Sequence, residues 1–470
     1  MNKKKELMKN TVIIFIGKVC TQLISFFLLP LYTGYLSTSD YGIVDLITTY
    51  ITLLVPIITL ELEMSIFRYL IDSRGSSSDS KKLLSNNFYV LSVSLIIFTI
   101  LYLIVTCFVH IPFRFIILFD IIVCTLSGNF LQIARGKGKT LDFSISCIIT
   151  GLTTIISNIL LIAVFKMGAK GMIISMALAN MMCSLYLFLR LKMYKDIDFK
   201  LVDKKLLKGM FNYSVPLIPN GISWWIINVS DRSIISWILG AGANGLYAVS
   251  NKFPTILSSL LGIFNLSWSE SSALHINSPD RDEFFSDTVN TVVKLFTSLG
   301  VGMIACMPFV FPLLINIRYT GAYNQIPILV LGAVFNVIIC LYSSIYIAQK
   351  KTKEVAITSI IGAIINIVVN VLLIKKIGLY AASISTAISY FVMMLYRYFD
   401  MKKYISIKFE KKLILKTLLI FIFTIIIYYQ HNLILSLICL IIVILYSYLL
   451  NRKFLLTTSK EIMNKIKMKR

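Results

Sequence analysis

The chain has 470 residues, of which 57% are hydrophobic and 14% are charged, and its mean hydropathy is +0.82. Soluble domains carry about 25% charged residues, so a soluble protein of several domains is excluded. The charges are unequal, with 46 Lys and Arg against 22 Asp and Glu, a formal net charge of +24. Nucleic-acid binding would need a basic patch on a soluble module, and this apolar chain offers no such module.

Apolar stretches long enough to cross a bilayer recur along the chain. A spanning helix needs about 20 apolar residues, and Pro112 divides the longest apolar stretch in two. We therefore expect an all-α polytopic membrane protein with fourteen transmembrane helices. The expected spans are 10–32, 42–62, 84–108, 111–133, 141–165, 171–189, 206–229, 234–268 (usable from about 245), 287–311, 325–348, 354–374, 378–398, 413–430 and 432–450.

The basic residues alternate between the connecting segments. With the N-terminus placed inside, the inner segments hold 35 of the 46 Lys and Arg, the outer ones hold 7, and 4 fall inside spans. Short loops rich in Lys and Arg stay on the cytoplasmic side. This bias predicts an even number of spans with both termini cytoplasmic, and the acidic segment 269–286 is the exception.

Short matches suggest that the first six spans repeat as the next six. Tyr41-Gly42-Ile43 corresponds to Asn244-Gly245-Leu246 at an offset of 203 residues. Two parallel six-helix lobes with a cleft between them are a transporter architecture. We expect an N-lobe at 1–200 with spans 1–6, a C-lobe at 201–404 with spans 7–12, and spans 13 and 14 with a basic tail at 405–470.

Two spans each carry one continuous polar stripe, with residues spaced alternately by four and three positions as on a helix face. Small and hydroxyl residues also let helices pack closely, and we favour that explanation for spans 5 and 11. In spans 1, 2, 7 and 8 charges join the polar residues, which favours a water-filled cavity. The stripes are Asp45, Thr49, Thr52, Pro56, Thr59 and Glu63 in span 2, and Asn251, Thr255, Ser258, Gly262, Asn265 and Ser269 in span 8.

Three lysines lie inside expected spans, where a charge at the helix centre costs about 2.5–3.5 kcal/mol. Lys18 lies in span 1 near Gln22, and Lys252 lies in span 8 beside Asn251. Snorkelling to the interface would also explain Lys18 or Lys294, since neither is at the midplane. We predict that Lys18, Gln22, Asn251, Lys252 and Lys294 line the cavity.

Acids and arginines cluster at the ends of spans 2, 7 and 8. They serve either as interfacial anchors or as gates whose ion pairs open alternately. The gate candidates are Glu61, Glu63 and Arg68 after span 2, Asp231 and Arg232 after span 7, and Glu270 after span 8.

Nothing in the sequence predicts catalysis or a bound cofactor. Three scattered His and eight Cys without CxxC pairs give no metal site. We therefore expect no catalytic residue, no metal, no cofactor and no enzyme activity.

Short motifs recur at the ends of the first, second and eighth spans. They are Pro30-Leu31-Tyr32-Thr33, Leu36-Ser37 and Asp40-Tyr41-Gly42, with Phe67-Arg68-Tyr69 after span 2 and Trp268-Ser269-Glu270 after span 8. With these motifs the chain resembles the polysaccharide-biosynthesis flippases, the Wzx-type O-antigen and capsule repeat-unit exporters of the MOP superfamily. The fourteen spans and the six-plus-six lobes are also similar.

The resemblance implies an oligosaccharide repeat unit linked to undecaprenyl pyrophosphate, flipped from the inner to the outer leaflet of the bacterial cytoplasmic membrane by alternating access. It implies that Lys18, Lys252 and Lys294 meet the pyrophosphate. Related lipid II flippases have several cavity arginines in span 1, where this chain has only Lys18. The expected partners are this lipid-linked substrate, membrane lipid and polysaccharide polymerase or assembly proteins, with no nucleic acid, and the chain is expected to be a monomer.

Two alternatives stay open. A cation-coupled small-molecule exporter of the same fold would use acids in the first lobe, for which Asp45 and Asp120 are the candidates. A membrane-embedded polysaccharide polymerase would need a sizeable outer loop, but the outer loops are at most about fifteen residues long.

Overall fold

The computed structural model describes residues 24, 26–74, 76–349, 351–408 and 410–467, and every regular element among them is helical. The chain divides into two compact units, residues 1–245 and 246–470. The lobe boundaries expected at residues 200 and 404 were defined by a sequence repeat, whereas these units are defined by contacts. The boundaries therefore stay a prediction.

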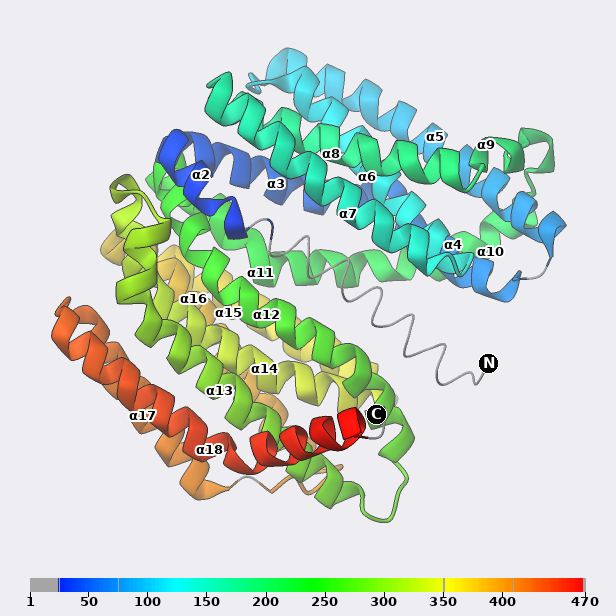
Figure 1. Cartoon of the computed structure of the whole chain (residues 1–470). Helices are drawn as coiled ribbons and strands as arrows, with labels where there is room; N and C mark the ends of the chain where they lie inside the picture. The colour runs from blue at the N-terminus through cyan, green and yellow to red at the C-terminus, as the bar shows by residue number, and fades with distance from the viewer. Residues whose placement is uncertain (1–23, 25, 75, 350, 409, 468–470) are drawn as a thin grey trace. The chain divides into compact units, whose positions relative to one another are not determined.

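The first unit is a bundle of long helices, with the short helices α4, α9 and α10 at one end (Figure 1). The helices α5, α6, α7 and α8 run side by side, and α3 packs against α8 and α11. The elements are α2 (Leu29–Tyr35), α3 (Thr38–Thr59), α4 (Leu62–Asp72), α5 (Ser77–Phe108), α6 (Arg114–Gly136), α7 (Thr140–Asn158), the π-helical turn η1 (Ile159–Val164), α8 (Gly168–Arg190), α9 (Met193–Asp196), the 3-10 turn η2 (Phe199–Leu201), α10 (Lys204–Ser214), the 3-10 turn η3 (Val215–Leu217) and α11 (Ile218–Leu239).

Local sequence explains where α3 begins and ends. The Ser37 hydroxyl accepts a hydrogen bond from the backbone N–H of Asp40 at 3.0 Å, which caps the first turn. At the other end Leu60 and Glu61 adopt left-handed backbone conformations, which turn the chain into α4. This turn places Glu61 between the two helices and Glu63 in the first turn of α4.

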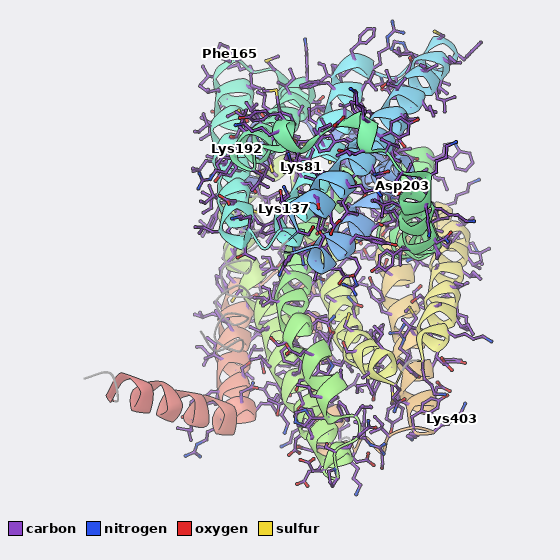
Figure 2. All side chains as sticks on the ribbon, turned by 90° about the vertical axis from the view of Figure 1, so that its right-hand side faces the viewer. Lys81, Lys137, Phe165, Lys192, Asp203 and Lys403 are labelled. Atoms are coloured by element: carbon purple, nitrogen blue, oxygen red, sulfur yellow. The ribbon has the colours of Figure 1, made fainter. Side chains whose placement is uncertain are left out.

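Three connections of the first unit meet at one end, shown in Figure 2 by Lys137, Lys192 and Asp203. Lys82 Nζ lies 2.6 Å from Asp203 Oδ2, and Lys137 Nζ lies 2.8 Å from Asp196 Oδ2. Arg74 Nε donates to the carbonyl of Gly136 at 2.7 Å. The segments 68–83, 134–140 and 190–208, all assigned to the inner side by their basic residues, therefore share one face.

The second unit is also a helix bundle, in which α14 and α15 pack against α16, and α13 packs against α14, α17 and α18. Its elements are α12 (Ala241–His275, whose first turn belongs to the first unit), α13 (Arg281–Leu314), the 3-10 segment η4 (Ile317–Gln325), α14 (Ile326–Ala348), α15 (Thr352–Ile377), α16 (Leu379–Met401), α17 (Lys411–Tyr429) and α18 (Leu433–Lys467).

The connections of the second unit also sort to two ends. Asp282 Oδ2 accepts from the backbone N–H of Ser406 at 3.2 Å, and Lys351 Nζ lies 4.4 Å from the ring centre of Tyr404. At the other end the Tyr428 hydroxyl donates to the carbonyl of Tyr323 at 2.7 Å. The predicted alternation of loops thus agrees with the contacts inside each unit.

Ten described helices are long and apolar enough to cross a membrane, and Leu415–Tyr429 is a shorter apolar helix. The chain is therefore a multi-pass membrane protein. Of the fourteen expected spans, the first lies mostly outside the described residues. The helices α11 and α12 are 22 and 35 residues long but are not among the ten found in the described residues.

Span 7 was expected at 206–229, and the structure corrects this. Residues 204–214 form the separate helix α10, η3 follows at Pro216, and the long helix runs from Ile218 to Leu239. The proline favours a helix break and restart, because it lacks an N–H and fixes its own φ.

Candidate functional site

The structure places the described part of the predicted cavity set on helices of the second unit. Lys18 and Gln22 lie outside the described residues. Asn251, Lys252 and Lys294 lie on α12 and α13 of the second unit. The gate candidates Glu61, Glu63, Arg68, Asp231 and Arg232 belong to the first unit, and Glu270 belongs to the second.

An ion pair joins α3 to α11 within the apolar part of the first unit. Arg232 Nε lies 2.9 Å from Asp45 Oδ2, and about a sixth to a fifth of each side chain is exposed. The Asn244 side-chain amide donates to the carbonyl of Gly42 at 2.9 Å and lies 3.4 Å from the same Asp45 oxygen. Because a buried charge needs a partner, this pair explains how α3 tolerates an acid in a membrane span.

The same helix pair meets again one turn further along α3. Trp225 Nε1 donates to the carbonyl of Thr49 at 2.9 Å, and its ring lies 6.3 Å from that of Tyr50. The polar stripe of span 2 therefore faces α11 at these positions. Close helix packing and intramembrane polarity coincide there, so the two explanations of the stripe are not exclusive.

Asp231 and Arg232 were expected at the end of span 7, and the structure corrects that position. Both lie within α11, which continues to Leu239. The apolar residues Ile234 and Ile235 after the charged pair extend the helix, and the Asp45 partner explains why the arginine is tolerated.

Glu61 and Glu63 sit at the break between α3 and α4. Burial raises the pKa of both carboxyl groups, and the negative charge of Glu63 raises that of Glu61 further. Among the described residues, the buried Glu63 Oε2 has no hydrogen-bond partner. The nearby Arg68 bonds to Asp72 at 2.6 Å on an exposed face of α4, so its recorded ion pair is with Asp72.

The stripe of span 8 lies along α12 and is largely satisfied by that helix's own backbone. The Asn251 amide donates to the carbonyl of Tyr247 at 3.0 Å, and the Thr255 hydroxyl donates to that of Asn251. Further along, the Ser344 hydroxyl of α14 donates to Asn265 Oδ1 at 2.8 Å. Lys252 is half-buried, and Glu270 is exposed on the same helix.

Lys294 has a partner that the sequence did not suggest. Its Nζ lies 2.7 Å from Glu410 Oε1, in a groove lined by α13, α17 and α18. The structure therefore groups Lys294 with the two C-terminal helices, and not with Asn251 and Lys252.

A further acid is enclosed in the first unit. Asp120 of α6 is 1% exposed, and its Oδ1 accepts from the Asn180 amide of α8 at 3.3 Å. The Asn180 oxygen in turn accepts from the Ser127 hydroxyl at 3.2 Å. Among the described residues, no group of three His, Cys, Asp or Glu could hold a metal ion.

Arg397 is a buried cation that sequence reasoning missed. Its place beside the basic residues Lys402 and Lys403 favours an exposed position on the inner side, but it lies within α16 and is 0% exposed. Its guanidinium donates to Thr358 Oγ1 at 2.8 and 3.0 Å, to the carbonyl of Ile339 at 2.9 Å, and to Ser343. The spacing of the buried residues Tyr390, Met393, Arg397 and Met401 follows a helix face, and this was the available signal.

Comparison with protein families identifies the chain. The family described as polysaccharide biosynthesis protein matches residues 7–268, more than half of the sequence. The chain belongs to the polysaccharide biosynthesis protein family. The match contains Lys18 and Lys252 but ends before Lys294.

Known structures place this family member in a common fold. Lipid II flippase MurJ in an inward closed conformation has a TM-score of 0.73 and 18% identity, with 95% of this chain and 100% of that one covered. An inward-facing multidrug resistance MATE transporter of the MOP superfamily has a TM-score of 0.68 and 10% identity, with 81% and 95% covered. The family member therefore shares the fold of these two membrane proteins.

A curated relative is also similar in sequence. An uncharacterised membrane protein of Methanocaldococcus jannaschii is 24% identical over 233 residues, which are 48% of this chain and 45% of that protein. This chain thus spans less than half the length of the curated relative that it matches.

Proposed function

We propose that this chain translocates a polyprenyl-pyrophosphate-linked oligosaccharide repeat unit from the inner to the outer leaflet of the bacterial cytoplasmic membrane by alternating access. The observation that carries the proposal is the family match over residues 7–268, which contains two lysines in expected spans. The fold shared with lipid II flippase MurJ supports a lipid-linked substrate. We expect the chain to act as a monomer, with polysaccharide polymerase or assembly proteins as its partners.

The chemistry of the substrate suits fixed cations. A sugar head group cannot cross hydrocarbon unaided, so a polar path is needed, and pyrophosphate forms charge-assisted hydrogen bonds with ammonium groups. We assign this role to Lys18 and Lys252, with Gln22 and Asn251 beside them. An inside-negative potential helps an anion leave by about 2.3 kcal/mol per charge per 100 mV, so flipping needs no ATP.

Fewer charged residues are candidates for a gate than the sequence suggested. The Asp45–Arg232 pair joins two helices of the same unit, so it stabilises that unit and need not break during transport. Glu61, Glu63 and Glu270 stay the candidates for contacts that change between states.

Substitution of Lys18 and Lys252 tests the function. In cells that depend on this chain for surface glycan, we expect Lys252→Ala and Lys18→Ala each to lower export about tenfold or more, because a charge-assisted hydrogen bond contributes roughly 1.5–3 kcal/mol. Lys252→Arg should retain more export than Lys252→Gln. The matched control is Lys170→Ala, which removes an exposed lysine at the start of α8. Unchanged export in both alanine variants, at equal expression, would rule out the cationic path.

A cation-coupled small-molecule exporter is the second candidate, because Asp120 is enclosed beside Asn180 in the manner of a carboxyl that exchanges a cation. For this function Asp120→Asn would abolish efflux of a cationic dye from cells, while glycan export would be unaffected by Lys252→Ala. The two activities thus respond to different substitutions.

A further inference from the structure

The second unit contains a groove of about 1280 Å³ between α13, α17 and α18. Its lining changes character along the helices. The polar and charged residues of the lining lie near the start of α17 and at the end of the apolar part of α18. Lys294 of α13 lies beside them. The remaining wall is apolar and includes Leu419, Phe423, Ile442 and Leu449.

The polar end of the groove carries an excess of positive charge. Lys294 is paired with Glu410 at 2.7 Å, whereas Lys416 and Arg452 are exposed and form no ion pair with a described acid. The groove therefore holds three cations and one anion, an excess of two positive charges.

Helix contacts place the polar end of the groove at the ends of the apolar helices. The Asn451 amide donates to the Ser298 hydroxyl at 2.8 Å, which joins α18 to α13 one turn from Lys294. Lys416 lies at the first turns of the apolar helix Leu415–Tyr429, and Arg452 ends the apolar stretch Leu433–Arg452. Both cations thus lie where two apolar segments meet the membrane surface.

The chain beyond Arg452 continues as a helix that turns away from the apolar part of α18 (Figure 2). Its sequence contains Lys453, Lys460, Lys465 and Lys467. A basic helix that follows a span in this way is suited to the headgroup layer of an anionic leaflet.

We propose that this groove binds an anionic phospholipid of the membrane, with its phosphate at Lys416 and Arg452 and an acyl chain along Phe423 and Ile442. Basic pockets between membrane helices hold anionic headgroups by charge, and the apolar wall replaces lipid contacts with protein contacts. Because Glu410 forms an ion pair with Lys294, Lys416 and Arg452 are the two cations that bind the phosphate. The groove lining contains neither Asn251 nor Lys252, and lipid binding can be measured without transport.

Lipid binding to the purified full-length protein tests the site. After delipidation in detergent, native mass spectrometry with added phosphatidylglycerol or phosphatidylcholine should show preferential retention of phosphatidylglycerol. Lys416→Gln with Arg452→Gln should weaken that retention about twenty-five-fold, since each cation near the surface contributes about fivefold. The charge-retaining pair Lys416→Arg with Arg452→Lys should bind as the native protein does.

The matched control removes two lysines from the same end of the same unit. Lys402→Gln with Lys408→Gln changes the net charge equally, and both residues are exposed and outside the groove. This variant should keep the native preference. Leu449→Trp should weaken phosphatidylglycerol binding without any change of charge, because the larger side chain fills the space beside the apolar wall of the groove.

Four results would overturn the proposal. They are equal retention of the two phospholipids, unchanged selectivity in the Lys416→Gln and Arg452→Gln double variant, displacement of the lipid by inorganic phosphate at the same concentration, and stronger competition by a polyprenyl phosphate, which would assign the groove to the transported carrier. Loss of glycan export would bear only on the proposed function, because the lipid measurement needs no transport.

Discussion

Individual charged residues in this chain are placed by their partners. Asp45 lies in a span because Arg232 neutralises it at 2.9 Å, and Arg397 is fully buried because hydroxyl and carbonyl oxygens surround its guanidinium. Lys294 pairs with Glu410, which is 116 residues away in sequence. Their burial therefore follows from long-range packing, and local hydropathy alone cannot reveal it.

Glu63 provides a pH-dependent prediction at this scale. Burial raises its pKa in the folded protein above the unfolded value of about 4.3. The folded state then binds the proton more tightly, so its contribution to stability is largest at low pH and is lost as pH rises through the folded pKa. We expect Glu63→Gln to raise the Tm at pH 7 by roughly 2 °C or more.

The measurement is a thermal melt of the purified protein in detergent at several pH values. The Tm difference between Glu63→Gln and the native chain should shrink below about pH 4. Glu270→Gln, a change at an exposed carboxylate, should leave the profile unaltered. A Glu63→Gln variant that is less stable at neutral pH would contradict the placement of this carboxyl, whose buried Oε2 has no hydrogen-bond partner among the described residues.

At the scale of elements, α3 crosses the first turn of α12 at a close backbone contact. A Cβ on Gly42 would lie 1.9 Å from the carbonyl oxygen of Ala241, and a Cβ on Gly245 would lie 1.9 Å from that of Thr38. The contact is reciprocal, and residues 38 and 42 are related to 241 and 245 by the repeat offset of 203. A reciprocal contact at this offset agrees with the predicted internal repeat, which stays a prediction.

Gly42→Ala should therefore separate the two helices, because the obstructing atom belongs to the backbone and cannot rotate away. We expect a loss of about 1–3 kcal/mol, measured by thermal or denaturant unfolding in detergent. Gly128→Ala on α6 is the control, since its Cβ would meet nothing within 4 Å. Equal stability of the two variants would disprove the backbone contact.

At the scale of the whole molecule, the alternation of basic loops predicts which loops lie on the same side of the membrane. The contacts within each unit agree with this prediction. Segments 134–140 and 190–208 meet at one end of the first unit, and segments 349–353 and 397–412 meet at one end of the second. The positive-inside rule predicts that both ends face the cytoplasm.

Cysteine labelling in intact cells checks this topology. In a Cys107→Ser background, which removes an exposed cysteine, Lys195→Cys and Lys402→Cys should resist a membrane-impermeant maleimide until the cells are opened. Lys170→Cys should react in intact cells, because it starts α8 on the predicted outer side. Labelling of residues 195 and 402 from opposite sides would contradict the even number of spans between them.

The sequence by itself determined the membrane class, the helical fold, the pairing of loops at each end and the resemblance to polysaccharide flippases. These follow from hydropathy, charge and short motifs, which are properties of contiguous segments. The helix break at Pro216, the Asp45–Arg232 pair, the burial of Arg397 and the groove around Lys294 needed the tertiary structure. The physical reason is that a charge in an apolar span is tolerated only where a partner distant in sequence is brought to it, and folding alone decides which partner that is.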